Sequence, residues 1–128
     1  MKRDDLKRHI LEKYDGDSDF PWMQYPTYEV FRHRDNRKWF ALVMEIPKCK
    51  IGLEGTAPID VVNLKCDPIM IGSFLQERGI FPAYHMSKAN WLTVALDDSA
   101  ADDTILFLLD ISFELTRSKS RRKSHDRL

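Results

Sequence analysis

The first periodic stretch of the chain carries a single apolar stripe. Leu6, Ile10 and Tyr14 recur at every fourth position, a spacing that places side chains on one face of an α-helix. A helix is therefore predicted over residues 4–14. The turn-forming run Asp15-Gly16-Asp17-Ser18 follows and is expected to stop that helix.

Alternating apolar and polar positions then predict three strands. Residues 28–34 and 39–46 form a predicted hairpin around residues 35–37, and residues 60–66 form a third strand. Successive side chains of a strand point to opposite faces of the sheet. In the second strand, the face expected to lie in the core carries Phe40, Leu42, Met44 and Ile46, and the other face carries Trp39, Ala41, Val43 and Glu45.

A second helix is predicted to begin at Asp67 and Pro68. An aspartate at the N-cap accepts hydrogen bonds from free helix N–H groups, and proline suits the first helical position. The side chains expected to form its buried stripe are Met70, Ile71, Phe74 and Leu75. Gly79 is expected to end this helix in a left-handed C′ position.

The rest of the domain predicts a second hairpin, from residues 81–86 to residues 91–96, and a final helix capped by Asp102 or Asp103. The element order is helix, three strands, helix, two strands, helix. Short connections between neighbouring strands predict a mostly antiparallel sheet. Helices on one face of such a sheet make a two-layer α+β fold, α-β(3)-α-β(2)-α.

Composition is that of one domain, expected to span residues 1–116. The chain has 128 residues, of which 43% are hydrophobic, so a core is available. The charged segment Met1–Lys13 resembles no signal peptide, and the longest aliphatic and aromatic runs, of five residues, are too short to span a membrane. A soluble, cytoplasmic protein is therefore expected. Cys49 and Cys66 lack zinc-like spacing; a disulfide between them stays open, two reduced thiols are favoured, and no metal or cofactor is expected.

The zero net charge of the chain conceals an uneven distribution. Residues 117–128 contain six basic residues and one acidic residue, whereas residues 1–116 contain 14 basic and 19 acidic residues. The tail has no apolar residue before Leu128, so we expect it to be disordered. Its Arg121, Arg122 and Lys123 are candidate contacts to a polyanion. A tail that only confers solubility, or that neutralises the acidic domain, is an equally good interpretation.

Three segments resemble the bacterial YjbR/MmcQ family. Residues 65–68, Lys-Cys-Asp-Pro, resemble its "K-c-D-P" segment, and residues 82–91 resemble its "P-a-Y-H-M-n-K-x-x-W" signature. Residues 110–115 resemble its closing "d-x-S-y-x-l". The positions that carry the resemblance are Asp67, Pro68, Pro82, Tyr84, His85, Met86, Lys88, Trp91 and Ser112. Because these segments occur in the family's order over residues 1–116, the match is fairly specific.

The resemblance implies an α-β(3)-α-β(2)-α fold, similar to secretion chaperones and distantly to the frataxin-like (CyaY-like) fold. Members are commonly labelled DNA-binding, largely by structural analogy. This chain departs from the family pattern at Ser87, which replaces an asparagine, and at residues 34–38, where a charged turn replaces a short glycine turn. The basic tail is a further departure. Because of these differences, residue roles known from the family can be assigned to the first hairpin less securely than to the second.

Basic side chains gather at the predicted tip of the first hairpin. These are Arg32, Arg34, Arg37 and Lys38. A two-stranded ribbon with a basic tip can grip backbone phosphates or enter a groove of DNA. The alternative is a solvated turn kept soluble by its charge. The family resemblance makes the two interpretations about equal.

Alternation also predicts an aromatic sheet face opposite the helices. Its expected members are Trp39, Val43, Val61, Lys65, Trp91 and Thr93. Aromatic rings beside cations can stack bases or hold a peptide. Burial of the rings by residues 20–22, Phe-Pro-Trp, or by a dimer partner is the preferred interpretation.

Tyr84, His85 and Lys88 invite an acid–base interpretation. No nucleophile, oxyanion donor set or carboxylate pair accompanies them, so a structural role is favoured. In that role, His85 hydrogen-bonds across the hairpin and Lys88 binds backbone carbonyls. The aspartates between residues 4 and 19 lack regular calcium-loop spacing and are attributed to helix capping and solubility.

The function predicted from the sequence is non-enzymatic nucleic-acid binding that is directed to the backbone and weakly sequence-specific. The hairpin tip and the tail would carry it, with Lys65 and Lys88 as further cationic contacts. The alternative is a protein- or peptide-binding adaptor that uses the open sheet face. The partners expected are accordingly DNA, a protein or a second copy of the chain.

Overall fold

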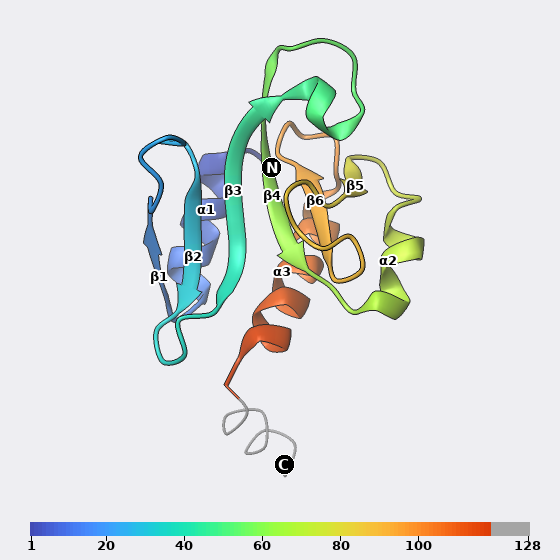
Figure 1. Cartoon of the computed structure of the whole chain (residues 1–128). Coiled ribbons are helices and arrows are strands. Elements are labelled where there is room, and N and C mark those ends of the chain that lie inside the picture. Colours follow the sequence, from blue (N-terminus) through green and yellow to red (C-terminus); the bar gives the residue numbers. More distant parts are fainter. Residues whose placement is uncertain (119–128) are drawn as a thin grey trace.

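The computed structural model describes residues 1–118 and shows one six-stranded antiparallel sheet with three α-helices (Figure 1). The helices are α1 (Arg3–Lys13), α2 (Pro68–Phe74) and α3 (Asp102–Thr116), with a 3-10 helix, η1 (Lys48–Ile51). The strands are β1 (Gly16–Asp19), β2 (Glu29–His33), β3 (Trp39–Pro47), β4 (Pro58–Lys65), β5 (Ile80–Pro82) and β6 (Trp91–Ala95). Their order across the sheet is β1-β2-β3-β4-β6-β5, so the predicted α+β class is confirmed.

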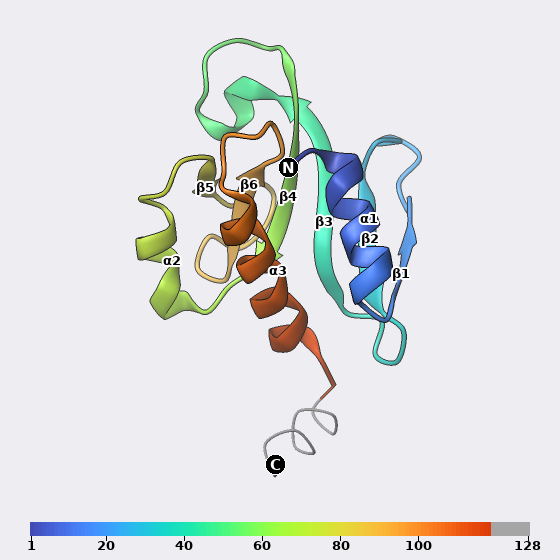
Figure 2. The same ribbon diagram turned by 180° about the vertical axis from the view of Figure 1, so that it is seen from behind.

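The sheet is covered differently on its two faces. Helices α1 and α3 lie side by side across one face, as Figure 2 shows, whereas α2 lies at the side of the sheet next to β5. We call the face under α1 and α3 the helix face and the opposite face the loop face. Figure 1 views the loop face, where the segment between β5 and β6 runs in front of the strands.

Strand β1 was not predicted. Gly16 lies opposite His33 at the edge of the sheet, where a β-carbon on Gly16 would stand 2.8 Å from the carbonyl oxygen of Arg32. This close approach of two backbones suits a glycine. The four residues of β1 are polar or glycine, so no apolar alternation marks the strand in the sequence.

The predicted faces of β3 are wrong. Ala41 and Val43 belong to the helix-face core, whereas Leu42 and Met44 belong to a second core on the loop face. Phe40 nevertheless packs in the helix-face core, because the register shifts between Phe31 and Arg32 in β2. Arg32 pairs with Trp39 and Phe31 with Ala41, which leaves Phe40 as the extra residue of a bulge.

The remaining strands and α3 also contribute apolar residues to the helix-face core. Val62, Leu64 and Cys66 lie in the helix-face core with Leu92, Val94 and Leu96 of the second hairpin. The residues of α3 that pack there are Ile105, Leu108, Leu109 and Phe113. Ser112 of α3 is also buried, and its hydroxyl donates to the carbonyl oxygen of Phe40 (2.6 Å) and accepts from the backbone N–H of Lys65 (2.9 Å). This side chain joins α3 to both β3 and β4.

Two helix ends differ from prediction. Asp67 does cap α2, since its side chain accepts a hydrogen bond from Ile69 N–H (3.0 Å), but α2 ends at Phe74. Gly79 has the expected left-handed conformation (φ +80°), yet it precedes β5 and does not follow the helix directly. Ala101 occupies the N-cap of α3, so Asp102 and Asp103 lie in the first helical turn and do not cap it.

Within residues 1–118, no helix is long and apolar enough to cross a membrane. Cys49 is exposed, Cys66 is buried, and both are free thiols. Burial raises the pKa of the Cys66 thiol. The tail candidates Arg121, Arg122 and Lys123 lie outside the described residues.

Candidate functional site

The arginines at the first hairpin tip form ion pairs with the β1 edge. Arg34 Nε lies 3.3 Å from Asp15 Oδ1 and 3.2 Å from Asp17 Oδ1. Arg37 Nη1 lies 2.8 Å from Asp17 Oδ2. These aspartates were attributed to capping and solubility, but antiparallel pairing of β1 with β2 brings them to the arginines. The aspartates of the β1 edge therefore neutralise much of the positive charge of the tip.

The guanidinium of Arg32 also has partners within the fold. Its Nε lies 3.4 Å from Asp19 Oδ1, and its guanidinium stands over the Trp39 ring, 5.5 Å from the ring centroid. Of the four tip residues, Lys38 alone has no carboxylate within ion-pair distance among residues 1–118. The geometry thus favours the solvated-turn interpretation of the tip over phosphate binding.

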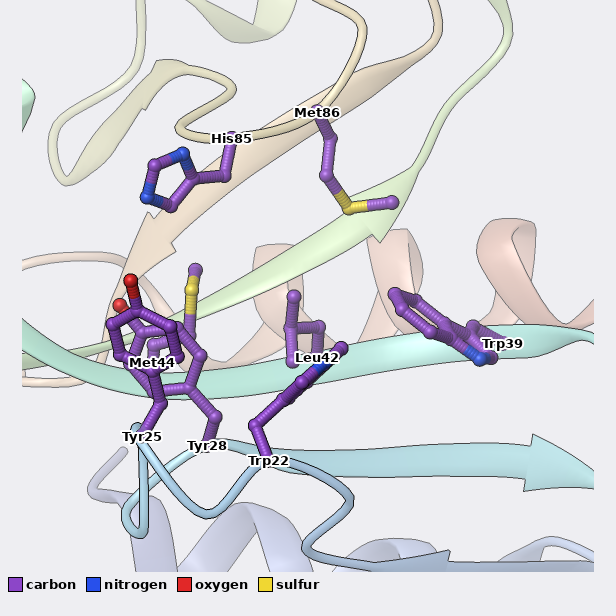
Figure 3. Close-up of a pocket in the computed structure, with 8 residues that line it drawn as sticks. All are labelled: Trp22, Tyr25, Tyr28, Trp39, Leu42, Met44, His85 and Met86. Atoms are coloured by element: carbon purple, nitrogen blue, oxygen red, sulfur yellow. The ribbon is translucent and has the colours of Figure 1, made fainter.

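An aromatic pocket of about 310 Å³ lies on the loop face (Figure 3). We define the aromatic pocket by the residues that line it: Trp22, Tyr25, Tyr28, Trp39, Leu42, Met44, His85 and Met86. In Figure 3, Trp22 and the tyrosines come from the segment before β2, and Leu42 and Met44 rise from β3. His85 and Met86 descend from the segment between β5 and β6, so the pocket lies between two loops over a strand.

Ring contacts fix the walls of this pocket. Trp22 packs edge-on against Trp39, with 5.5 Å between centroids and an interplanar angle of 80°. Tyr25 stacks on Tyr28 at 4.8 Å and 20°. The segment at residues 20–22 was expected to bury the aromatic face, and Trp22 does cover one side of Trp39. The pocket remains because this cover stops short of the loop at His85.

The composition of the predicted aromatic face needs one correction. Val43 points to the helix face, because the bulge at Phe40 changes the alternation between Trp39 and Val43. Val61 lies in the loop-face core as expected. Lys65 is paired with Trp91 across β4 and β6, but neither lines the aromatic pocket. The sequence therefore identified Trp39 and its contact with the segment of Trp22, but it missed Tyr25 and Tyr28 as pocket residues.

The segment between β5 and β6 is held by hydrogen bonds at its start. Asn63 Nδ2 donates to the Tyr84 carbonyl oxygen (2.8 Å), and Tyr84 N–H donates to Thr93 Oγ1 (2.9 Å). Lys88 Nζ donates to the Ala83 carbonyl oxygen (3.0 Å), which confirms the expected role of this lysine as a ligand of backbone carbonyls.

Within residues 1–118, His85 makes no hydrogen bond across the hairpin, so its expected role is wrong. It adopts a left-handed backbone conformation (φ +65°), and its ring packs on that of Tyr84 with 3.9 Å between centroids. A non-glycine residue in this conformation is uncommon and is held by its surroundings. His85 and Met86 of the Tyr-His-Met signature both line the aromatic pocket.

Cations without a countercharge border this face. Within residues 1–118, five lysines from segments that border the loop face have no carboxylate within ion-pair distance: Lys38, Lys48, Lys50, Lys65 and Lys88. They come from the start of β3, from η1, from the end of β4 and from the β5–β6 segment. By contrast, Arg3 and Lys7 of α1 form ion pairs, notably Lys7 Nζ to Glu29 Oε2 at 2.7 Å.

Comparisons with known proteins agree with the fold and with one another. The model of the YjbR family matches residues 11–115. An uncharacterised Bacillus subtilis protein, YyaQ, is 38% identical over 117 residues, covering 91% of this chain and 99% of its own. The uncharacterised protein YjbR of Escherichia coli K12 is 37% identical over 54 residues, which cover 41% of this chain and 46% of that protein.

Solved structures show the same architecture. A crystal structure of a Pseudomonas syringae protein has a TM-score of 0.88 and 45% identity, covering 91% of this chain and all of that one (100%). A Deinococcus radiodurans protein has a TM-score of 0.68 and 25% identity, covering 96% of this chain and 86% of that one.

Proposed function

The chain belongs to the YjbR family, and we propose that it is a cytoplasmic, non-enzymatic module that binds single-stranded nucleic acid on its loop face. The carrying observation is the aromatic pocket on a sheet face whose bordering segments hold lysines that have no carboxylate within ion-pair distance among residues 1–118. In this proposal an unpaired base enters the pocket, and the positive charge of the lysines attracts the flanking phosphates. The binding surface is thus the sheet face and not the tip of the first hairpin.

Aromatic side chains are the usual platform for unpaired bases. Stacking of one base on an aromatic ring is worth about 1–3 kcal/mol and tolerates any sequence, because every base has a π-face. Trp22 and Trp39 present perpendicular rings at one wall, and Tyr25 and Tyr28 present stacked rings at another. A duplex keeps its bases stacked on one another, so this pocket favours a single strand.

The charge distribution supports the same ligand. Free lysines attract phosphate mainly by releasing counterions, which makes the affinity depend on salt. A paired arginine contributes less, because a phosphate must displace the carboxylate that it already binds. Among residues 1–118, the hairpin tip and α1 hold mostly paired cations, whereas the segments that border the loop face hold lysines without a carboxylate in ion-pair distance.

A peptide ligand is the second candidate, for a specific reason. Met23 is 95% exposed and Tyr25 is 50% exposed, while the pocket itself includes Met44 and Met86. Methionine-rich surfaces adapt to varied apolar side chains. An adaptor of this kind would bind an apolar segment of another protein in the aromatic pocket, with little dependence on salt.

A salt-series titration tests the proposed function. Labelled single-stranded oligothymidylate and a duplex of equal length are titrated with the full chain. We expect the single strand to bind more tightly, and its affinity to fall as salt rises. Trp22→Ala should weaken binding by about tenfold, since it removes one stacking surface. Phe20→Ala is the matched control, because Phe20 is in the same segment, is 52% exposed and does not line the pocket.

Two results would count against nucleic-acid binding. One is the absence of affinity for the single strand even at low salt. The other is equal affinity of the wild-type chain and the Trp22→Ala variant. If an apolar peptide binds instead, and Trp22→Ala weakens it, the adaptor function replaces the proposed one.

A further inference from the structure

A smaller pocket, of about 150 Å³, lies beside the aromatic pocket. We call it the lysine pocket, and its lining residues are Lys50, Ile51, Pro82, Ala83, Tyr84 and Lys88. Tyr84 lines the lysine pocket and His85 lines the aromatic pocket, and their ring centroids are 3.9 Å apart. Two consecutive residues with rings in tilted contact (39° between planes) therefore link the two pockets.

Two parts of the fold bring the lysines together. Lys50 is in η1, whose loop is closed by hydrogen bonds from Lys48 N–H to Ala57 O (3.0 Å) and from Cys49 N–H to Gly55 O (2.9 Å). Lys88 comes from the β5–β6 segment, far away in sequence. The closed loop thus brings Lys50 to the same pocket as Lys88.

The ammonium groups retain free donors. Lys88 Nζ uses one of its three donors on Ala83 O, a bond that also fixes its position. Lys50 has no ion pair within residues 1–118, and no acidic side chain lines this pocket. Two ammonium groups at a small concave site, without a carboxylate, are suited to an anion with several acceptor oxygens.

We infer that the lysine pocket binds the phosphate of the nucleotide whose base occupies the aromatic pocket. The inference rests on the proposed function and makes it more specific: the unit recognised is one nucleotide, with its base and phosphate on either side of Tyr84 and His85. Lys50 and Lys88 contact the phosphate oxygens. The remaining lysines of the loop face contribute charge at a distance only.

A competition experiment separates this inference from general charge attraction. Labelled oligothymidylate bound to the full chain is displaced with thymidine, with thymidine 3′- or 5′-monophosphate, and with inorganic phosphate. We expect the better monophosphate to compete at roughly tenfold lower concentration than thymidine, since a charge-assisted hydrogen bond contributes about that factor or more. Inorganic phosphate alone should compete poorly, because it lacks the base.

Lys50→Gln is the decisive variant, because Lys50 has no bond within the described fold whose loss would disturb the loop. In this variant, the advantage of the monophosphate over thymidine should fall to about threefold or less. Lys48→Gln is the matched control, since Lys48 is in the same 3-10 helix but lines neither pocket. It should retain the full advantage.

The outcomes distinguish the phosphate assignment from the proposed binding of single-stranded nucleic acid. If the oligonucleotide binds but thymidine and its monophosphates compete equally, the phosphate assignment is overturned and the proposed function stands. The same holds if Lys50→Gln and Lys48→Gln behave alike. If the oligonucleotide fails to bind, or binds independently of Trp22, the proposed function and the inference both fail.

Discussion

Thr93 donates a hydrogen bond of 2.5 Å to the side-chain oxygen of Asn63, and both side chains are fully buried on the loop face. The two residues lie opposite each other in the register of β4 and β6. Between them they bind both backbone groups of Tyr84, one through the Asn63 amide and one through the Thr93 hydroxyl. This polar pair therefore fixes the position of Tyr84, in the segment between β5 and β6, relative to strands β4 and β6.

Asn63→Ala should destabilise the fold by about 1–3 kcal/mol, because it leaves the buried Thr93 hydroxyl and Tyr84 carbonyl without their partner. Denaturant unfolding measures the change. Asn90→Ala is the control, since Asn90 makes only a long, exposed bond to Ser87 (3.4 Å) with its side chain. Equal midpoints for Asn63→Ala and the wild type would contradict this role for the pair.

Ser112→Ala should cost about 1–3 kcal/mol for a similar reason. Its hydroxyl binds the Phe40 carbonyl and the Lys65 N–H, and Ser112 itself is fully buried, so the substitution removes a partner from two backbone groups. Thermal unfolding should show a lower midpoint, with oligonucleotide affinity at low temperature nearly unchanged. A loss of affinity without a loss of stability would give Ser112 a direct role in binding.

Asp67→Ala removes the side-chain cap of α2 and should destabilise the protein by about 1 kcal/mol. Glu54→Ala changes the same charge in the exposed loop after η1 and serves as the control. An Asp67→Ala midpoint that matches the Glu54→Ala midpoint would show that the cap contributes nothing.

Sequence patterns predicted the helices, the places of five of the six strands and the capping residue Asp67, because each has a local signal. The strand predicted over residues 81–86 is shorter than expected, since β5 ends at Pro82. Periodicity marks Leu6 and Ile10, and a proline at the first helical position marks α2. The faces of β3 could not be predicted, since both are buried and the bulge at Phe40 shifts the alternation. An apolar pattern distinguishes the two faces of a strand only where one of them meets water.

The candidate site was less predictable, because it depends on contacts between distant segments. Trp39 and His85 stood out in the sequence, but nothing local links them to Trp22 or to Lys50. The ion pairs at the basic tip could not be predicted for the same reason. The aspartates that pair with its arginines belong to β1, a strand that carries no apolar alternation.

The tip offers a direct contrast with the loop face. Changing Arg34, Arg37 and Lys38 together to alanine removes three exposed or half-exposed cations, two of them paired with Asp15 or Asp17. We expect stability to change by less than about 1 kcal/mol, as for other surface ion pairs. The slope of log affinity against log salt should fall by about 1 or less. A fall of about 2–3 would restore the tip as the main contact to the phosphate backbone.

Tryptophan fluorescence tests the central claim most directly. The chain has three tryptophans, and Trp91→Phe leaves only Trp22 and Trp39, both of which line the aromatic pocket. The measurement is the emission of this variant during titration with single-stranded oligothymidylate at low salt. If a base enters the pocket, the emission should be quenched in a saturable way, at the same concentrations at which a labelled strand binds. Unchanged emission while the labelled strand binds, or no binding at all, would contradict base binding in the aromatic pocket.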